Sequence, residues 1–205
     1  MKRAKTSKAW MKQHVKDYFV QQAKKEGYRS RAAYKLLEIN ARDHILKPGM
    51  TVVDLGSAPG SWSQVASHKV GSSGKVIALD ILAMQPLPGV HFIQCDFREE
   101  GAIEELKKQL NDRSLDLVIS DMSPNISGIV ISDQARSIYL AELALAFAME
   151  QLNYGGNFLV KVFQGRDFDQ FLMEMRENFK KVLIRKPDAS RDRSNELYLL
   201  GIEKQ

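Results

Sequence analysis

The chain has 205 residues, of which 44% are apolar and 27% are charged, and it carries a formal net charge of +5. This length favours one domain of the α/β size class, and the composition excludes a disordered, collagen-like or membrane-spanning protein. A single cysteine, Cys95, excludes an internal disulfide, and the lysine-rich start lacks the apolar run of a signal peptide. We therefore expect a monomeric, cytoplasmic protein without a membrane partner.

The first 47 residues form a basic segment, with 13 Lys and Arg against 4 Asp and Glu. Helices are expected here over Ala9–Lys25 and Arg31–Arg42, the second capped by Ser30. Residues 48–175 are acidic, with 9 basic residues against 16 acidic ones, whereas residues 176–193 are basic again, with 7 against 3. This distribution is consistent with a solvated surface, but it is also typical of proteins that bind a polyanion. Forked phosphate donors are expected at Arg29, Arg31, Arg185, Arg191 and Arg193.

From residue 50 onward, strand and helix patterns alternate. Apolar, β-branched runs predict strands at Thr51–Leu55, Lys75–Leu79, His91–Cys95, Leu115–Ser120, Asn157–Phe163, Lys181–Arg185 and Leu197–Ile202. Helical patterns cover Ser63–Val70, Glu99–Leu110, Asp133–Leu152 and Asp167–Phe179. Such alternation indicates a mostly parallel sheet with helices on both faces. The last two strands are too close in sequence for a helical crossover, so they are expected to form an antiparallel hairpin.

The loop Asp54-Leu-Gly-Ser-Ala-Pro-Gly60 follows the first strand and precedes a helix. Ligands of doubly wound sheets bind at this position, where Gly56 and Gly60 allow the backbone to approach a ligand closely. Asp80 ends the second strand and is placed to accept hydrogen bonds from ribose hydroxyls. Asp96, after the third strand, is placed to bind an adenine amino group. The pattern therefore predicts a nucleotide-like cofactor.

Two cofactors compete for this loop. NAD needs helix N-terminal N–H groups for its pyrophosphate, but Ala58 breaks the glycine spacing and Pro59 removes one donor. S-adenosylmethionine has no phosphate, and its sulfonium and ammonium groups favour acidic and aromatic neighbours, here Asp54, Asp121 and Trp62. We therefore favour S-adenosylmethionine over NAD.

Four segments resemble the FtsJ-like large-subunit ribosomal RNA 2′-O-ribose methyltransferases: Asp54–Gln64, Asp121–Asn125, Val160–Gly165 and Arg185–Ser194. The similarity runs from about Trp10 to Ile202. It departs from the family pattern at Ser57 and Ser61, where alanine and glycine are expected. The resemblance implies a Rossmann-like methyltransferase fold of seven strands with the last one antiparallel. From their charge, we expect residues 1–47 to be a basic, helical, RNA-binding extension of the same domain as the methyltransferase region, residues 48–205.

The same resemblance implies a catalytic set of two lysines and two carboxylates: Lys35, Asp121, Lys161 and Glu196. Its cofactor-binding residues carry over to Gly60, Trp62, Asp80, Asp96 and Asp121. From the residues alone, Lys161 already stands out, because it interrupts the apolar strand 158–163. Our hypothesis is that Lys161 removes the proton of a ribose 2′-hydroxyl, that Asp121 and Glu196 orient it, and that Lys35 positions the hydroxyl.

The implied substrate is a uridine of 23S RNA in an assembled or nearly assembled large ribosomal subunit, and the implied product of the cofactor is S-adenosylhomocysteine. Three alternatives remain open. One is a ribose methyltransferase for transfer RNA or a messenger cap, one is a nicotinamide dehydrogenase, and one is a non-catalytic RNA-binding assembly factor. No metal is expected, because the four histidines lack the spacing of metal ligands.

Overall fold

The computed structural model describes residues 17–124, 127–190 and 194–205. The strands are β1 (Thr51–Leu55), β2 (Lys75–Asp80), β3 (Val90–Gln94), β4 (Leu117–Ser120), β5 (Asn157–Phe163), β6 (Phe179–Arg185) and β7 (Glu196–Lys204). The helices are α2 (Tyr18–Glu26), α3 (Ala32–Asp43), α4 (Ser61–Val70), α5 (Glu100–Leu110), α6 (Val130–Gln151) and α7 (Phe168–Asn178). The predicted helix Ala9–Lys25 is not continuous, because the extended backbone of Asp17 starts α2 at Tyr18; the residues of that prediction before Asp17 lie outside the described residues.

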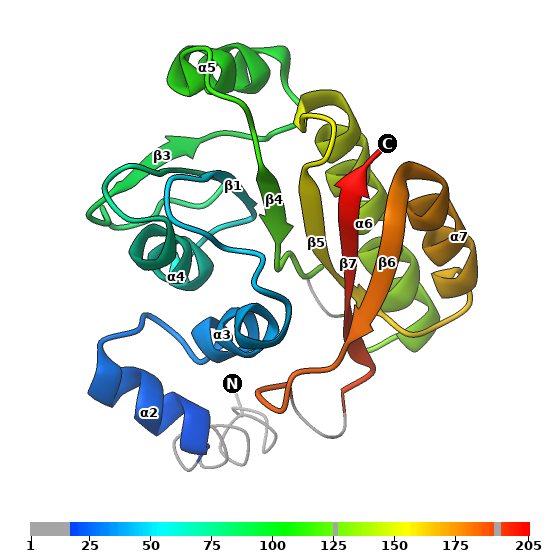
Figure 1. Ribbon diagram of the computed structural model, residues 1–205. Coiled ribbons are helices and arrows are strands. Elements are labelled where there is room, and N and C mark those ends of the chain that lie inside the picture. Colours follow the sequence, from blue (N-terminus) through cyan, green and yellow to red (C-terminus); the bar gives the residue numbers. More distant parts are fainter. Residues whose placement is uncertain (1–16, 125–126, 191–193) are drawn as a thin grey trace.

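The seven strands form one sheet in the order β3-β2-β1-β4-β5-β7-β6 (Figure 1). Strands β1 to β5 pair in parallel, whereas β7 is antiparallel to both β5 and β6. This confirms the predicted α/β class, the parallel body of the sheet and the antiparallel ending. Because the chain order reverses between β1 and β4, the carboxyl ends of these two strands flank the switch point at which ligands of such sheets bind.

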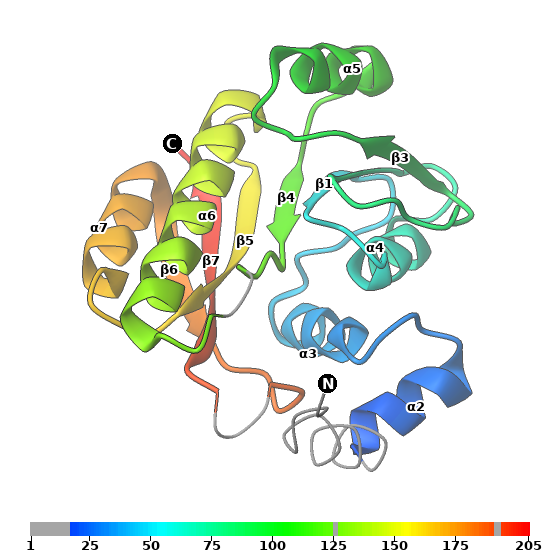
Figure 2. The same ribbon diagram turned by 180° about the vertical axis from the view of Figure 1, so that it is seen from behind.

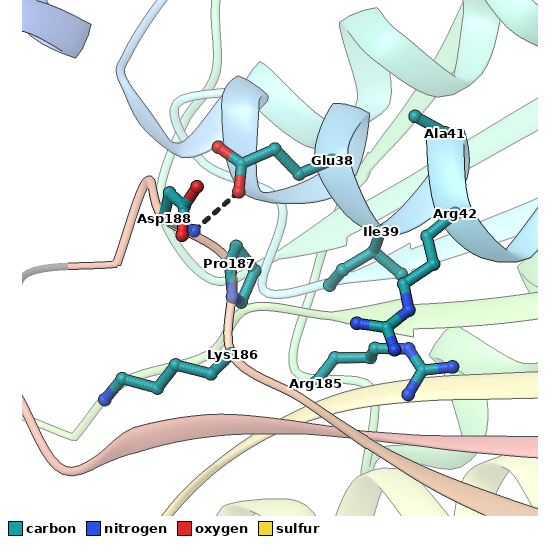
Figure 3. Close-up of a pocket in the computed structure, with 8 residues that line it drawn as sticks. All are labelled: Glu38, Ile39, Ala41, Arg42, Arg185, Lys186, Pro187 and Asp188. Carbon is teal, nitrogen blue, oxygen red and sulfur yellow. Dashed lines mark hydrogen bonds between the residues drawn. The ribbon is translucent and has the colours of Figure 1, made fainter.

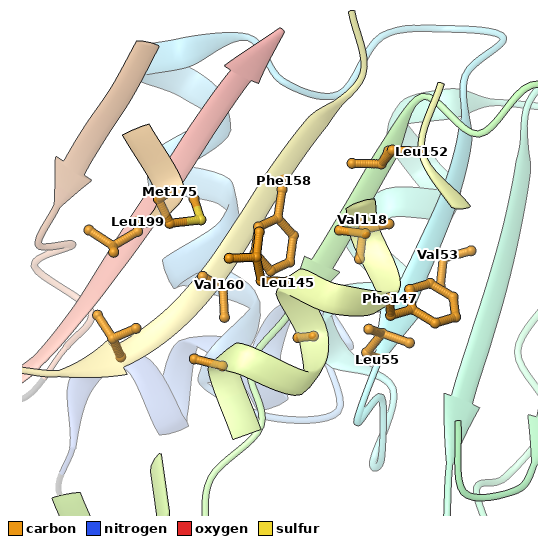
Figure 4. Close-up of a cluster of buried hydrophobic side chains, with 14 of the residues drawn as sticks. Val53, Leu55, Val118, Leu145, Phe147, Leu152, Phe158, Val160, Met175 and Leu199 are labelled. Atoms are coloured by element: carbon orange, nitrogen blue, oxygen red, sulfur yellow. The ribbon is translucent and has the colours of Figure 1, made fainter. Parts of the chain in front are cut away.

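Each face of the sheet buries its own apolar cluster. Strand residues alternate between the faces, so Val53 and Leu55 pack with α6 and α7, whereas Val52 packs with α3 and α4. Figure 4 shows part of the first cluster, in which Phe158, Leu145 and Met175 meet between β5 and the helices. Figure 2 shows α6 and α7 lying over that face. Helices therefore cover both faces, as predicted.

Helices α2 and α3 lie at the edge of the sheet toward which β4 points (Figure 1). The Asp17 carboxylate caps α2 by accepting hydrogen bonds from the N–H groups of Phe19 and Val20. Helix α3 buries Leu36 and Ile39 against the sheet, in the cluster that also contains Tyr198. The basic N-terminal segment therefore contributes a helix to the core next to the carboxyl ends of the strands.

Helix α6 starts earlier than predicted. The sequence pattern predicts a long helix over Asp133–Leu152, but α6 begins at Val130. The Asp133 carboxylate instead reaches back to the preceding turn, where it accepts hydrogen bonds from the N–H groups of Ser127, at 2.8 Å, and Gly128, at 3.0 Å. The Asp133 carboxylate therefore satisfies N–H groups of the turn that precedes the helix, and it does so from a position inside the helix.

Within the described ranges, no helix combines the length and the apolar character that crossing a membrane requires.

Candidate active site

The sheet register brings the predicted catalytic residues together. Ser120 of β4 lies opposite Val160 of β5, so Asp121 follows directly beside Lys161. Lys161 lies opposite Tyr198 of β7, and Phe163 lies opposite Glu196. Since side chains alternate along a strand, Lys161 points to the same face as Leu159, which is the face covered by α3.

Three ion pairs join these residues into one cluster. The Nζ atom of Lys161 lies 3.1 Å from Oδ1 of Asp121 and donates a hydrogen bond of 2.6 Å to the Asp121 backbone carbonyl. The Nζ atom of Lys35 lies 2.7 Å from Oε1 of Glu196 and 3.7 Å from Oδ1 of Asp121. The Lys161 side chain is only 5% exposed. The structure therefore places all four predicted residues within one largely desolvated contact network, which we call the catalytic cluster after the predicted role of its residues.

A fifth member of the cluster, Tyr198, is indicated by the sequence pattern only as part of an apolar strand. Its hydroxyl lies 2.8 Å from Oδ1 of Asp121 and 3.1 Å from Oε1 of Glu196, so it bridges the two carboxylates. Burial and then the charges of both carboxylates raise the pKa of Tyr198 well above its ordinary value, so the phenol keeps its proton. The sequence does contain a signal for this role of Tyr198. It lies two residues after Glu196, so both side chains point to the same face of β7.

Asp121 is the anion at the centre of the cluster. Burial alone would raise the pKa of its carboxyl, but the charges of Lys161 and Lys35 and the hydrogen bond from Tyr198 outweigh burial. The pKa of Asp121 consequently lies below its ordinary value, and the group stays ionised at neutral pH. An ionised Asp121 holds the Lys161 amine in a fixed direction.

A pocket of about 520 Å³ opens next to this cluster at the carboxyl ends of β1, β2 and β4. Its polar lining includes Asp80, Asp96 and Asp121, and its apolar lining includes Ile81, Phe97 and Leu140. The predicted cofactor loop forms one wall through Gly56 and Ala58. Asp121 therefore belongs to both the pocket and the catalytic cluster.

Two glycines shape the cofactor loop. A Cβ atom on Gly56, which has a φ of 70°, would lie 2.1 Å from Cγ of Met122 across the pocket. Gly60 has a φ of 102° and ends the loop as the N-cap of α4, where a Cβ atom would meet Met84 and Leu87. Both positions therefore require glycine, for the backbone conformation and for the space. Gly56 lines the pocket, whereas Gly60 supports the loop from outside it.

Hydrogen bonds to two carboxylates fix the position of this loop. Asp80 binds the loop backbone, and Asp54 binds a side chain of helix α4. The Asp80 carboxylate accepts hydrogen bonds of 2.7 Å from the N–H groups of Ala58 and Leu82. Asp54 is buried and accepts a hydrogen bond of 2.6 Å from the Ser63 hydroxyl. Burial is the main cause that raises the pKa of Asp54 to about 7, and the charges of Asp121 and Asp80 add to it.

Two predicted cofactor residues have other contacts in this structure. The Asp96 carboxylate lines the pocket but is paired with the Arg98 guanidinium, and this hydrogen bond is the main cause that lowers the pKa of Asp96. The Trp62 indole is buried under α3, where its Nε1 donates to the carbonyl of Ala32 at 2.8 Å. Trp62 does not line the pocket, so its indole does not provide the aromatic surface predicted for the cofactor there.

Three of the arginines predicted to bind phosphate form hydrogen bonds or ion pairs within the protein itself. Arg185 makes a two-pronged ion pair with Asp43, with distances of 2.6 and 2.7 Å. Arg31 pairs with Asp17 and also donates to the carbonyl of Ala189. The partners of these two arginines include carboxylates that no local pattern could reveal.

Arg29 links the cofactor loop to the segment that contains Pro86. Its guanidinium donates to the carbonyls of Pro59, at 2.7 Å, and Pro86, at 2.8 Å. The remaining two predicted arginines, Arg191 and Arg193, lie outside the described residues.

Metal ligation has no support in the described part of the chain, where no group of three or more His, Cys, Asp or Glu residues is arranged to hold an ion.

The chain is similar to known methyltransferases in sequence and in structure. The family model described as FtsJ-like methyltransferase matches residues 28–204. The proteins named ribosomal RNA large subunit methyltransferase E from Nitrosospira multiformis and Methylobacillus flagellatus are 66% and 62% identical over 205 residues. Each alignment covers all of this chain, with 100% and 99% of the relative. A structure from Plasmodium falciparum assigned as a ribosomal RNA methyltransferase superposes with a TM-score of 0.77 at 31% identity, covering 86% of this chain and 98% of the other.

Proposed function

Because the chain belongs to the FtsJ-like methyltransferase family, we propose that it transfers a methyl group from S-adenosylmethionine to the 2′-hydroxyl of a uridine in large-subunit (23S) ribosomal RNA. The position of Asp121 is the observation that carries this proposal. This residue lines the pocket and contacts Lys161 and Lys35, so the pocket and the polar cluster meet at one side chain. A methyl donor in the pocket and an acceptor hydroxyl at the cluster would therefore be neighbours.

The pocket fits S-adenosylmethionine by its chemistry. Three carboxylates, those of Asp80, Asp96 and Asp121, line it, which suits a cofactor that carries a sulfonium and an ammonium group. The apolar lining of the pocket suits an adenine ring. S-adenosylmethionine has no phosphate, so it does not need the N–H donor that Pro59 lacks. When bound, this cofactor supplies an electrophilic methyl carbon, and S-adenosylhomocysteine is the product.

The hydrogen bonds of Lys161 support its proposed role as the base. An uncharged amine has two N–H donors and one lone pair. Both donors have acceptors on Asp121, namely its backbone carbonyl and Oδ1. Once the ammonium group of Lys161 has released its third proton to solvent, its lone pair is directed away from Asp121, where it accepts the proton of the 2′-hydroxyl as the oxygen attacks the methyl carbon.

The other members of the cluster position the reaction. Asp121 fixes the Lys161 amine, while Glu196 holds Lys35, whose ammonium group steers the acceptor ribose. The hydroxyl of Tyr198 bridges the carboxylates of Asp121 and Glu196 and so fixes their relative position. Selection of RNA over DNA follows from this chemistry, because only RNA offers a 2′-hydroxyl.

We further propose that residues 1–47 and the segment around Arg191 and Arg193 form the RNA-contacting surface. The excess of basic residues in both segments supports this assignment. Binding of RNA should then weaken steeply as the salt concentration rises. We place the reaction in the cytoplasm, where large ribosomal subunits are assembled in bacteria, and we expect the protein to act as a monomer.

The test is transfer of a labelled methyl group from S-adenosylmethionine to 23S RNA, large ribosomal subunits and transfer RNA in parallel. We expect label in large-subunit RNA, with the modified linkage resistant to alkaline cleavage because its 2′-hydroxyl is blocked. Label in transfer RNA alone would replace the proposed substrate with transfer RNA. Label in none of the three would favour a non-catalytic assembly factor.

A further inference from the structure

A second pocket, of about 480 Å³, lies between α3 and the end of β6 (Figure 3). We call it the α3–β6 pocket. It adjoins the catalytic cluster on two sides. Glu38 and Ile39 in its wall follow Lys35 by one turn of α3, and Lys186 donates a hydrogen bond of 3.1 Å to the backbone carbonyl of Glu196. A strand of RNA whose 2′-hydroxyl occupies the cluster would therefore continue along or near this pocket.

Most charges in the pocket wall are already paired. Arg185 is neutralised by Asp43, and both carboxylate oxygens of Glu38 accept backbone N–H groups, those of Asp188 and Ala189. The Lys186 amine donates to the carbonyls of Ser194 and Glu196. These contacts hold the wall in shape but leave little capacity for a ligand.

Two charged side chains in the wall have no hydrogen bond or ion pair within the described residues, Arg42 and Asp188. Figure 3 shows the Arg42 guanidinium beside that of Arg185 at one side of the pocket and Asp188 at the other side. A bare anion would meet Asp188 as a like charge. A nucleotide matches both ends, because its phosphate is an anion and its base edge carries N–H donors.

We propose that the α3–β6 pocket holds the nucleotide adjacent to the methylated one, with its phosphate on Arg42 and its base edge facing Asp188. This inference rests on the proposed function and names a subsite for its substrate. The spacing agrees with it, since Lys35 and Arg42 are seven residues apart on one face of α3, about 10 Å along the helix axis. An adjacent nucleotide can reach across this distance from the catalytic cluster.

The direct test uses the 5′-phosphorylated dinucleotide pUpU and backbone amide resonances of the full chain. We expect pUpU to shift the amide signals of Ile39 and Lys186, and Arg42→Ala to weaken this binding at least about tenfold through loss of a charge-assisted contact. Arg42→Lys should restore part of it. The matched control is Arg176→Ala, which removes an exposed arginine from α7 on the opposite face and should bind like the unmodified protein. Equal binding by the Arg42→Ala variant would overturn the proposal, as would equal shifts from inorganic phosphate.

Methyl transfer to undermethylated large subunits separates this inference from the proposed function. In support of the subsite, Arg42→Ala should raise KM for the subunit more than it lowers kcat, leave affinity for S-adenosylmethionine unchanged, and reduce the salt slope of binding by about 0.7. If the unmodified protein transfers methyl groups and the Arg42→Ala variant matches Arg176→Ala in KM and salt slope, the subsite is refuted while the methyltransferase function stands. If no RNA is methylated but pUpU binds in an Arg42-dependent manner, the proposed function fails and the nucleotide pocket stands.

Discussion

Replacing the buried Asp54 by asparagine should change how the stability of the protein depends on pH. In the folded protein the pKa of Asp54 is about 7, compared with an ordinary value of 3.8, mainly because the carboxylate is desolvated. Between these two values the folded state binds a proton that the unfolded state has released. Stability from this group is therefore fully present below pH 4 and is lost as the pH rises toward and through 7.

The magnitude follows from the shift. A difference of roughly 3 pKa units, at 1.36 kcal/mol per unit, corresponds to about 4 kcal/mol of unfolding free energy lost between pH 4 and pH 8. The amide that replaces the carboxyl has no proton to release, so the free energy of unfolding of Asp54→Asn relative to the unmodified protein should improve by up to this amount across that range. The asparagine side chain can still accept the hydrogen bond from Ser63.

Urea unfolding of both proteins, measured at intervals from pH 4 to pH 8.5, gives the difference directly. The matched control is Asp112→Asn, which removes a carboxylate from an exposed turn and should leave the pH dependence unchanged. A second variant, Ser63→Ala, removes a hydrogen bond that lowers the pKa of Asp54 and should move the loss of stability to higher pH. Parallel stability curves for the unmodified protein and Asp54→Asn would show that Asp54 is ionised in the folded state over the whole range.

Three further predictions concern the active site. Lys161→Ala should abolish methyl transfer while leaving the dissociation constant of S-adenosylmethionine nearly unchanged, as measured by calorimetry; substantial remaining turnover would contradict its role as the base. Ser190→Ala should lower kcat with little change in KM, because the Ser190 hydroxyl lies 2.9 Å from Oε1 of Glu196 and helps to orient the partner of Lys35. Ser190→Thr, which keeps the hydroxyl, should retain more activity, and equal loss in both variants would point to a packing effect instead. Gly56→Ala should weaken cofactor binding at least about tenfold, since its Cβ would displace Met122 from the pocket wall and its φ of 70° disfavours alanine; unchanged affinity would show that the loop adapts.

Strand periodicity is sufficient to predict most of the fold and two members of the catalytic cluster, Lys161 and Asp121, the second because it follows the fourth strand. Alternating helical and strand patterns predict the parallel sheet, and the short connection between the last two strands predicts their antiparallel pairing. Lys161 can be identified because a lysine inside an apolar strand needs a partner. Lys35 and Glu196 carry no such local signal, since each is a single charge in an ordinary pattern, and their approach depends on how α3 packs on β7. Family resemblance alone predicts these two residues.

For the arginines and Trp62, the local sequence suggests a ligand contact, but the structure shows a contact within the protein. A guanidinium in a basic segment is read as a phosphate ligand, but Arg185 and Asp43 meet across 142 positions of sequence, which no charge count can reveal. Likewise, an aromatic residue next to a cofactor loop is read as a ligand contact, whereas the start of α4 turns the Trp62 indole toward Ala32. In both cases a long-range partner decides the role of the side chain.

The contribution of α3 has a practical consequence for anyone trimming this enzyme to a minimal catalytic unit. A fragment that starts at residue 48 would contain every strand of the sheet, yet it would lack Lys35 and would expose the aromatic pair of Trp62 and Tyr198 to water. Such a truncated protein should be both inactive and prone to aggregate. The twelve residues of α3 are therefore as necessary to a working fragment as any strand of the sheet.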